Sequence, residues 1–251
     1  MPPLPHELEP PHAARRDARR GDLLRELGVA AGATALVTAV SYGVPDKWAA
    51  TAVGLCFLAM SFALLGRQDA EGLRAHGLSL GGLLDPEPID PRRVLREAAE
   101  ALAWAVAAFV VILPPFWIGF RVWFSPREAL DPFALLPSLD LALGQLLVIA
   151  LPEEAFYRGY LQSRLDRCFT KRWSLGGAEI GPSLVITSAV FAAGHLLTLV
   201  NPTRLAVFFP SLLFGWLRAR TGGIGAAFVF HALCNLLSAS LSRAYGLGGA
   251  P

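Results

Sequence analysis

The chain has 251 residues, of which 54% are hydrophobic and only 17% are charged. This balance is too apolar for an ordinary soluble domain and indicates a multi-pass membrane protein. A net charge of +2 is too small to point to a nucleic-acid partner, and three widely separated cysteines match neither a disulfide framework nor a zinc motif.

The amino-terminal segment is rich in proline, arginine and acidic residues and lacks the apolar core of a cleaved secretory signal. We expect residues 1–24 to form a disordered cytoplasmic arm. Residues 25–251 contain no repeat and no low-complexity tract, so they are predicted to form a single transmembrane domain.

Apolar runs of roughly 18 to 22 residues, about the length that crosses a hydrocarbon core, follow one another along the chain. The sequence therefore predicts an all-α polytopic membrane bundle of about seven transmembrane helices. The sixth run is short and contains Pro210, so it is expected to be tilted, kinked or re-entrant. Residues 132–139 could lengthen the fourth run, and a count of eight helices is possible. The seven runs are Leu27–Val44, Trp48–Leu65, Ala101–Phe120, Leu141–Leu161, Leu184–Val200, Leu205–Leu217 and Ile224–Leu241.

The connections differ in charge. Arginine and lysine are concentrated in the amino-terminal arm, in residues 67–96 and in residues 158–172, and they are sparse in the alternate connections. This bias places the amino terminus in the cytoplasm. The proline-rich stretch 85–91 cannot continue a helix, so residues 67–100 are expected to form a surface loop.

Ionisable residues inside a membrane helix are expensive and usually mark a functional site. The fourth run contains Glu153, Glu154 and Arg158. Glu154 and Arg158 are four residues apart, so they lie on one helix face within reach of an ion pair. Glu153 points elsewhere and remains free to handle a proton. The alternative is an ion cluster at a helix end that reaches the membrane surface.

Two later runs also carry polar side chains. His195 follows Phe191 and three small residues, which leave room for a substrate or another helix. His231 and Asn235 lie one turn apart and can point at the same spot. Each motif alone is equally compatible with a packed histidine or a polar clasp between helices. A rise of 1.5 Å per residue puts Glu153, His195 and His231 at overlapping depths of roughly 11 to 17 Å.

This set has the parts of a water-activating hydrolase. Glu153 and His195 are the candidates for deprotonating and holding water. His231 and Asn235 are the candidates for stabilising an oxyanion.

The ordered motifs Glu-Glu-x-x-x-Arg, Phe-x-x-x-His and His-x-x-x-Asn resemble the CPBP intramembrane proteases, which include the type II CAAX prenyl endopeptidases and the bacterial Abi proteins. The resemblance covers about residues 145–242. It implies peptide-bond hydrolysis in or beside the bilayer, with the roles above for Glu153, His195, His231 and Asn235. Glu154, Arg158 and Phe191 are implied to support them.

No cofactor is favoured, because the zinc signature with two histidines on one helix is missing. Zinc remains the alternative, held by Glu153, His195 and His231 from separate helices.

The leading hypothesis is therefore an endopeptidase in a bacterial inner membrane. Its expected partners are membrane lipid and a membrane-anchored or lipidated protein, cleaved near one end. A composition rich in alanine and arginine keeps open a myxosortase-like role in processing carboxy-terminal sorting signals. The alternative class is a non-catalytic membrane protein, such as a bacteriocin-immunity factor or a small transporter. The sequence leaves the oligomeric state open.

Overall fold

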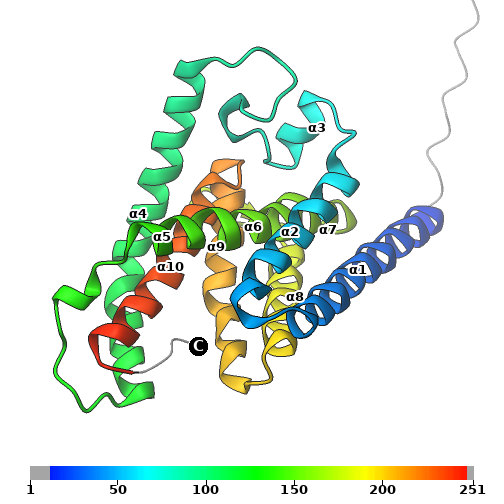
Figure 1. The fold of residues 1–251 in the computed structure, drawn as a ribbon. Helices are drawn as coiled ribbons and strands as arrows, with labels where there is room; N and C mark the ends of the chain where they lie inside the picture. Colours follow the sequence, from blue (N-terminus) through cyan, green and yellow to red (C-terminus); the bar gives the residue numbers. More distant parts are fainter. Residues whose placement is uncertain (1–11, 248–251) are drawn as a thin grey trace, which may run out of the picture.

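The computed structural model describes residues 12–247, which are mostly helical (Figure 1). Seven long helical segments account for most of this region. They are α1 (His12–Gly43), α2 (Asp46–Leu65), α4 (Pro91–Phe124), a composite helix over residues 139–168, α8 (Pro182–Thr198), α9 (Phe208–Thr221) and α10 (Gly225–Ala244).

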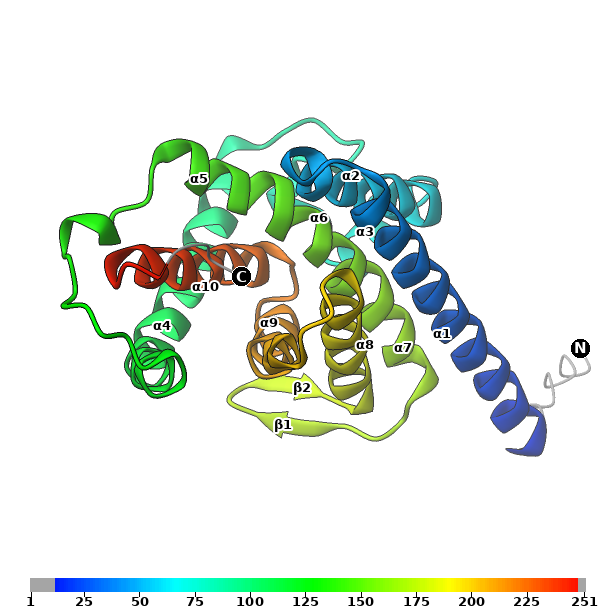
Figure 2. The same cartoon turned by 60° about the horizontal axis from the view of Figure 1, so that its bottom comes forward.

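The remaining elements are short and lie in the connections. They are α3 (Ala70–Ala75), the 3₁₀ turns η1 (Leu80–Gly82), η2 (Phe133–Leu135) and η5 (Pro202–Val207), and an antiparallel hairpin of β1 (Trp173–Leu175) and β2 (Ala178–Ile180). The hairpin lies at the ends of α8 and α9 (Figure 2). The sequence pattern did not predict it.

Five of the described helices are long and apolar enough to cross a membrane: α1, α2, α4, the segment Phe133–Cys168 and α10. Helix α8 is apolar but shorter. The prediction of an all-α polytopic bundle is confirmed. The candidate span that contains the fourth run begins at Phe133, in agreement with the expectation that residues 132–139 could lengthen this run.

Three local expectations differ from the structure. Helix α1 begins at His12, so residues 12–24 are helical and not part of a disordered arm, while residues 1–11 lie outside the described region. The helical conformation of residues 12–24 is explained by the alanine and arginine residues there, which are good helix formers. Helix α4 begins at Pro91, well before the end of the expected loop, because Asp90 caps it and proline is tolerated in the first turn.

Pro210 was expected to distort the sixth helix. It is the third residue of α9, which begins at Phe208. A proline in the first turn lacks an N–H that would be unsatisfied in any case, so no kink is required there.

The composite helix changes its winding around the two glutamates. Two π-helical segments, η3 (Gly144–Ala150) and η4 (Ala155–Gln162), flank the four-residue helix α6 (Leu151–Glu154), and α5 (Leu139–Leu143) and α7 (Ser163–Cys168) complete the run. Segments of π-helix are rare in proteins, and those that occur are often found at functional sites. The regular spacing of 3.6 residues per turn, expected from the sequence, therefore does not hold on either side of Glu153 and Glu154.

This composite helix packs against α2 on one side and against α8, α9 and α10 on the other (Figure 2). Helix α2 approaches η3 closely at Gly54, where an added Cβ would lie 2.2 Å from the carbonyl oxygen of Val148. Aromatic side chains, including Phe156, Phe191 and Phe214, fill the surrounding core. The bundle thus encloses the segment that carries Glu153 and Glu154.

Candidate active site

A buried network links the composite helix to α10. Arg158 Nη1 donates a hydrogen bond to Glu154 Oε1 at 3.0 Å, and both side chains are fully buried. The ion pair expected from their spacing is therefore present. His231 Nδ1 lies 2.9 Å from the same oxygen, Glu154 Oε1. Glu154 thus joins the arginine to the first residue of the His-x-x-x-Asn motif.

Arg158 is held by contacts with α9 and with two aromatic rings, although its Nε has no hydrogen-bond partner among the described residues. Its Nη2 donates to the carbonyl oxygen of Ser211 at 2.9 Å and to the hydroxyl at 2.6 Å, which ties the composite helix to α9. The guanidinium also lies over the rings of Phe191 and Phe214, 4.8 and 5.1 Å from their centroids. A cation in an apolar core needs such partners. This burial contradicts the alternative of an ion cluster reaching the membrane surface.

Glu153 is placed differently from Glu154. Its Oε2 lies 3.9 Å from His231 Nε2, which is too long for a hydrogen bond. The atom is buried and has no hydrogen-bond partner among the described residues. Glu153 and Glu154 therefore flank opposite nitrogens of one imidazole, and only Glu154 is neutralised by Arg158.

The hydrogen bonds fix the proton position on His231. Glu154 Oε1 already accepts from Arg158, so the contact with His231 is assigned as Nδ1–H donating to the carboxylate. The ring is held in place by stacking on Phe214, with centroids 4.6 Å apart and planes 16° apart. Its Nε2 consequently faces Glu153.

His195 and His231 both lie beside the ring of Phe191. The ring of Phe191 is 4.3 Å from that of His195 and 5.7 Å from that of His231, measured between centroids. His195 Nδ1 lies 3.0 Å from the carbonyl oxygen of Phe191, so it donates there and leaves Nε2 without a hydrogen. An added Cβ at Gly194 would lie 3.2 Å from the hydroxyl of Tyr157, which explains the small residue beside this histidine.

Asn235 joins the site through a residue that the sequence analysis missed. Its Nδ2 donates to Gln145 Oε1 at 2.9 Å, which orients the amide from η3. Within the described residues, no hydrogen bond joins Asn235 or His195 to Glu153. A polar glutamine in an apolar run was a signal for Gln145. Nothing in the sequence around Ser211 or Arg204 pointed to the site. Arg204 of η5 is nevertheless close enough for its charge to act on Glu153 and His195.

A metal site would need three ligand side chains close together. Among residues 19–247, whose side chains the structure describes, no group of three His, Cys, Asp or Glu side chains is close enough to hold a metal ion. Glu153 and His231 approach each other. The zinc set considered from the sequence, Glu153, His195 and His231, does not form such a group among these side chains.

Comparison with known families identifies the segment that carries this site. Residues 136–237 match the family model described as "Type II CAAX prenyl endopeptidase Rce1-like". This segment is therefore similar to the CPBP intramembrane proteases. No curated protein and no solved structure matches it.

The matched segment runs from just before α5 into α10 and includes all seven site residues singled out in the sequence. The match supports a peptide hydrolase, and specifically an intramembrane endopeptidase of the CAAX type. It favours this interpretation over the non-catalytic immunity or transport alternative. Helices α1, α2 and α4 lie outside the matched segment and complete the bundle around it.

Proposed function

We propose that the protein cleaves a membrane-anchored or lipidated protein near one end by direct attack of water. Glu153 takes the proton of the water with the help of His195, and His231 and Asn235 stabilise the oxyanion. The main observation is the buried Glu153 Oε2, which has no partner among the described residues and lies 3.9 Å from His231 Nε2. We place the enzyme in a bacterial inner membrane with its amino terminus in the cytoplasm.

Glu153 and Glu154 have different roles in this mechanism because their surroundings differ. Glu154 Oε1 is bound to Arg158 and His231, so the negative charge of this carboxylate is balanced, while its Oε2 has no hydrogen-bond partner among the described residues. Glu153 has no cation bound to it at hydrogen-bond distance and can accept a proton from water. His195, with an unprotonated Nε2, can hold the same water or share its proton.

The oxyanion donors are positioned by residues behind them. Since His231 donates Nδ1–H to Glu154, its Nε2 can donate to the oxyanion only when the ring carries a second proton. The amide of Asn235 has two N–H bonds, and Gln145 occupies one of them. The other is available to the developing negative charge. Gln145 and Glu154 are thus positioning residues.

Cells with and without the protein should differ in the ends of their membrane proteins. We expect mass spectrometry to find a new carboxy terminus in one or a few anchored proteins only when the wild-type chain is present. A lipid-modified cysteine near the cut would favour lipidated substrates, and loss of a terminal helix would favour sorting-signal processing. Identical termini in cells with the wild-type chain and in cells lacking it would contradict the proposal.

Metal removal should leave the activity unchanged. Because the described His, Cys, Asp and Glu side chains do not cluster as a metal site, we expect purified enzyme treated with a strong chelator to retain its cleavage rate within about twofold. The metal content of the same sample should be measured by elemental analysis. Activity that disappears with the chelator and returns with zinc would contradict this mechanism and restore the zinc alternative.

A further inference from the structure

A polar cavity lies away from the active site, between α1, the end of α2 and the junction of η4 with α7. Its volume is about 180 Å³. Two arginines, one glutamine and one tyrosine supply its polar surface, and two leucines supply an apolar wall. The lining residues are Arg25, Leu64, Leu65, Gln68, Tyr160 and Arg164.

The cavity is organised by a buried carboxylate. Glu26 is 1% exposed, and it accepts hydrogen bonds from Tyr160 Oη and from Arg164 Nε, the latter at 3.1 Å. Arg164 is therefore fixed through Nε, which leaves its two Nη groups for another acceptor. Within the described residues, Arg25 forms no ion pair. Arg25 and Arg164 carry two positive charges and Glu26 carries one negative charge, so these three side chains give the cavity an excess of positive charge.

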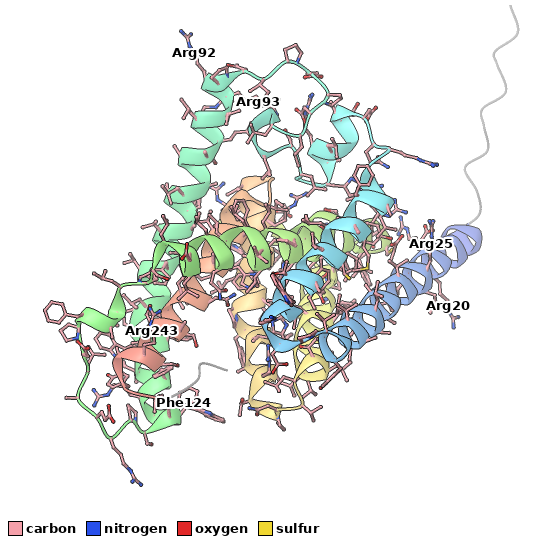
Figure 3. The ribbon with its side chains drawn as sticks, in the orientation of Figure 1. Arg20, Arg25, Arg92, Arg93, Phe124 and Arg243 are labelled. Carbon is pink, nitrogen blue, oxygen red and sulfur yellow. The ribbon has the colours of Figure 1, made fainter. Side chains whose placement is uncertain are left out.

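The surroundings indicate which anion would enter. Arg25 and Arg20 project from the amino-terminal part of α1 (Figure 3). Two further arginines are exposed near the elements that border the cavity. Arg67 follows the end of α2, and Arg167 lies in α7. Leu64 and Leu65 belong to a helix that can cross the membrane. The cavity thus joins a basic polar zone to the apolar part of the bundle, as at a membrane surface.

We propose that this cavity binds the phosphate of an anionic phospholipid headgroup. Arg25 and the Nη groups of Arg164 contact the phosphate oxygens, Gln68 hydrogen-bonds the headgroup, and the leucines face the first acyl carbons. Basic pockets between membrane helices are suited to such headgroups. The bound lipid joins α1 to α7 and stabilises their packing. This site is independent of the hydrolytic function proposed above.

The test uses the purified full-length protein in a neutral detergent with phosphatidylglycerol or phosphatidylcholine added. Lipid adducts are counted by native mass spectrometry, and the thermal midpoint is measured in parallel. We expect phosphatidylglycerol, and not phosphatidylcholine, to remain bound and to raise the midpoint. Arg25→Gln should weaken phosphatidylglycerol binding about fivefold, since one basic contact is lost.

Arg20→Gln is the matched control, because Arg20 is exposed on the same helix and does not line the cavity. The Arg20→Gln variant should bind phosphatidylglycerol with an affinity within about 1.5-fold of the wild type, since the charge of Arg20 is farther from the headgroup. Arg164→Gln is avoided, because it would strip buried Glu26 of its cation. Equal losses in the Arg20 and Arg25 variants, or no loss in either, would overturn the site. Equal stabilisation by inorganic phosphate alone would overturn the lipid as its occupant.

Discussion

Replacing Glu153 by glutamine should lower kcat about 10³-fold while leaving the fold intact, because a positioned general base contributes about 10² to 10⁴. Glutamine has nearly the same shape but cannot take a proton from water. Glu153 Oε2 has no hydrogen-bond partner among the described residues, so the swap breaks no hydrogen bond at that oxygen. The cleavage rate of a membrane-anchored peptide, measured with purified enzyme in lipid vesicles, checks this expectation.

Glu179→Gln provides the matched control, since Glu179 is exposed on β2 and outside the site. It should retain the wild-type rate. Helix content measured by circular dichroism should be the same in both variants and in the wild type. A Glu153→Gln enzyme that cleaves within a few-fold of the wild-type rate would remove this residue from the chemistry.

Arg158→Met should destabilise the protein by about 3 to 5 kcal/mol, the usual cost of removing one partner from a buried ion pair. The variant leaves the Glu154 carboxylate in the core without its cation and removes both hydrogen bonds to Ser211. Denaturant unfolding in detergent, followed by circular dichroism, gives the difference. Arg167→Met, an exposed change on α7, should shift stability by less than about 0.5 kcal/mol.

The double variant Glu154→Gln/Arg158→Met separates charge from packing. Removing both charges should recover part of the stability, because no uncompensated buried ion remains. Activity should not recover, since His231 loses the carboxylate that fixes its Nδ1 proton. If Arg158→Met alone unfolds no more easily than the Arg167 control, the network does not stabilise the bundle.

The features that the sequence predicted well are those set by spacing along one helix. The four-residue interval between Glu154 and Arg158 predicted their ion pair, which forms although Arg158 lies in the π-helical segment η4. Apolar length predicted the number of long helices. Contacts between distant segments could not be predicted in the same way. The contact of Arg158 with Ser211 spans 53 positions and that of Asn235 with Gln145 spans 90, so both depend on how the helices pack.

Local winding also escaped the sequence analysis. The π-helical segments η3 and η4 arise where the composite helix meets several neighbours, including the close approach of α2 at Gly54. Periodicity assumes a constant 3.6 residues per turn and cannot show such a change. The helical start of α1 was missed for a different reason, because a charged, proline-flanked segment has the composition of a disordered arm.

The central claim is that Glu153 activates the water that cuts the peptide bond. Its most direct test is mass spectrometry of the products formed from a membrane-anchored peptide in ¹⁸O-labelled water, by wild-type enzyme and by Glu153→Gln. We expect one ¹⁸O in each new carboxylate with the wild type, and no product above background with the variant in the same time. Equal amounts of labelled product from both proteins, or product without the label, would contradict the mechanism.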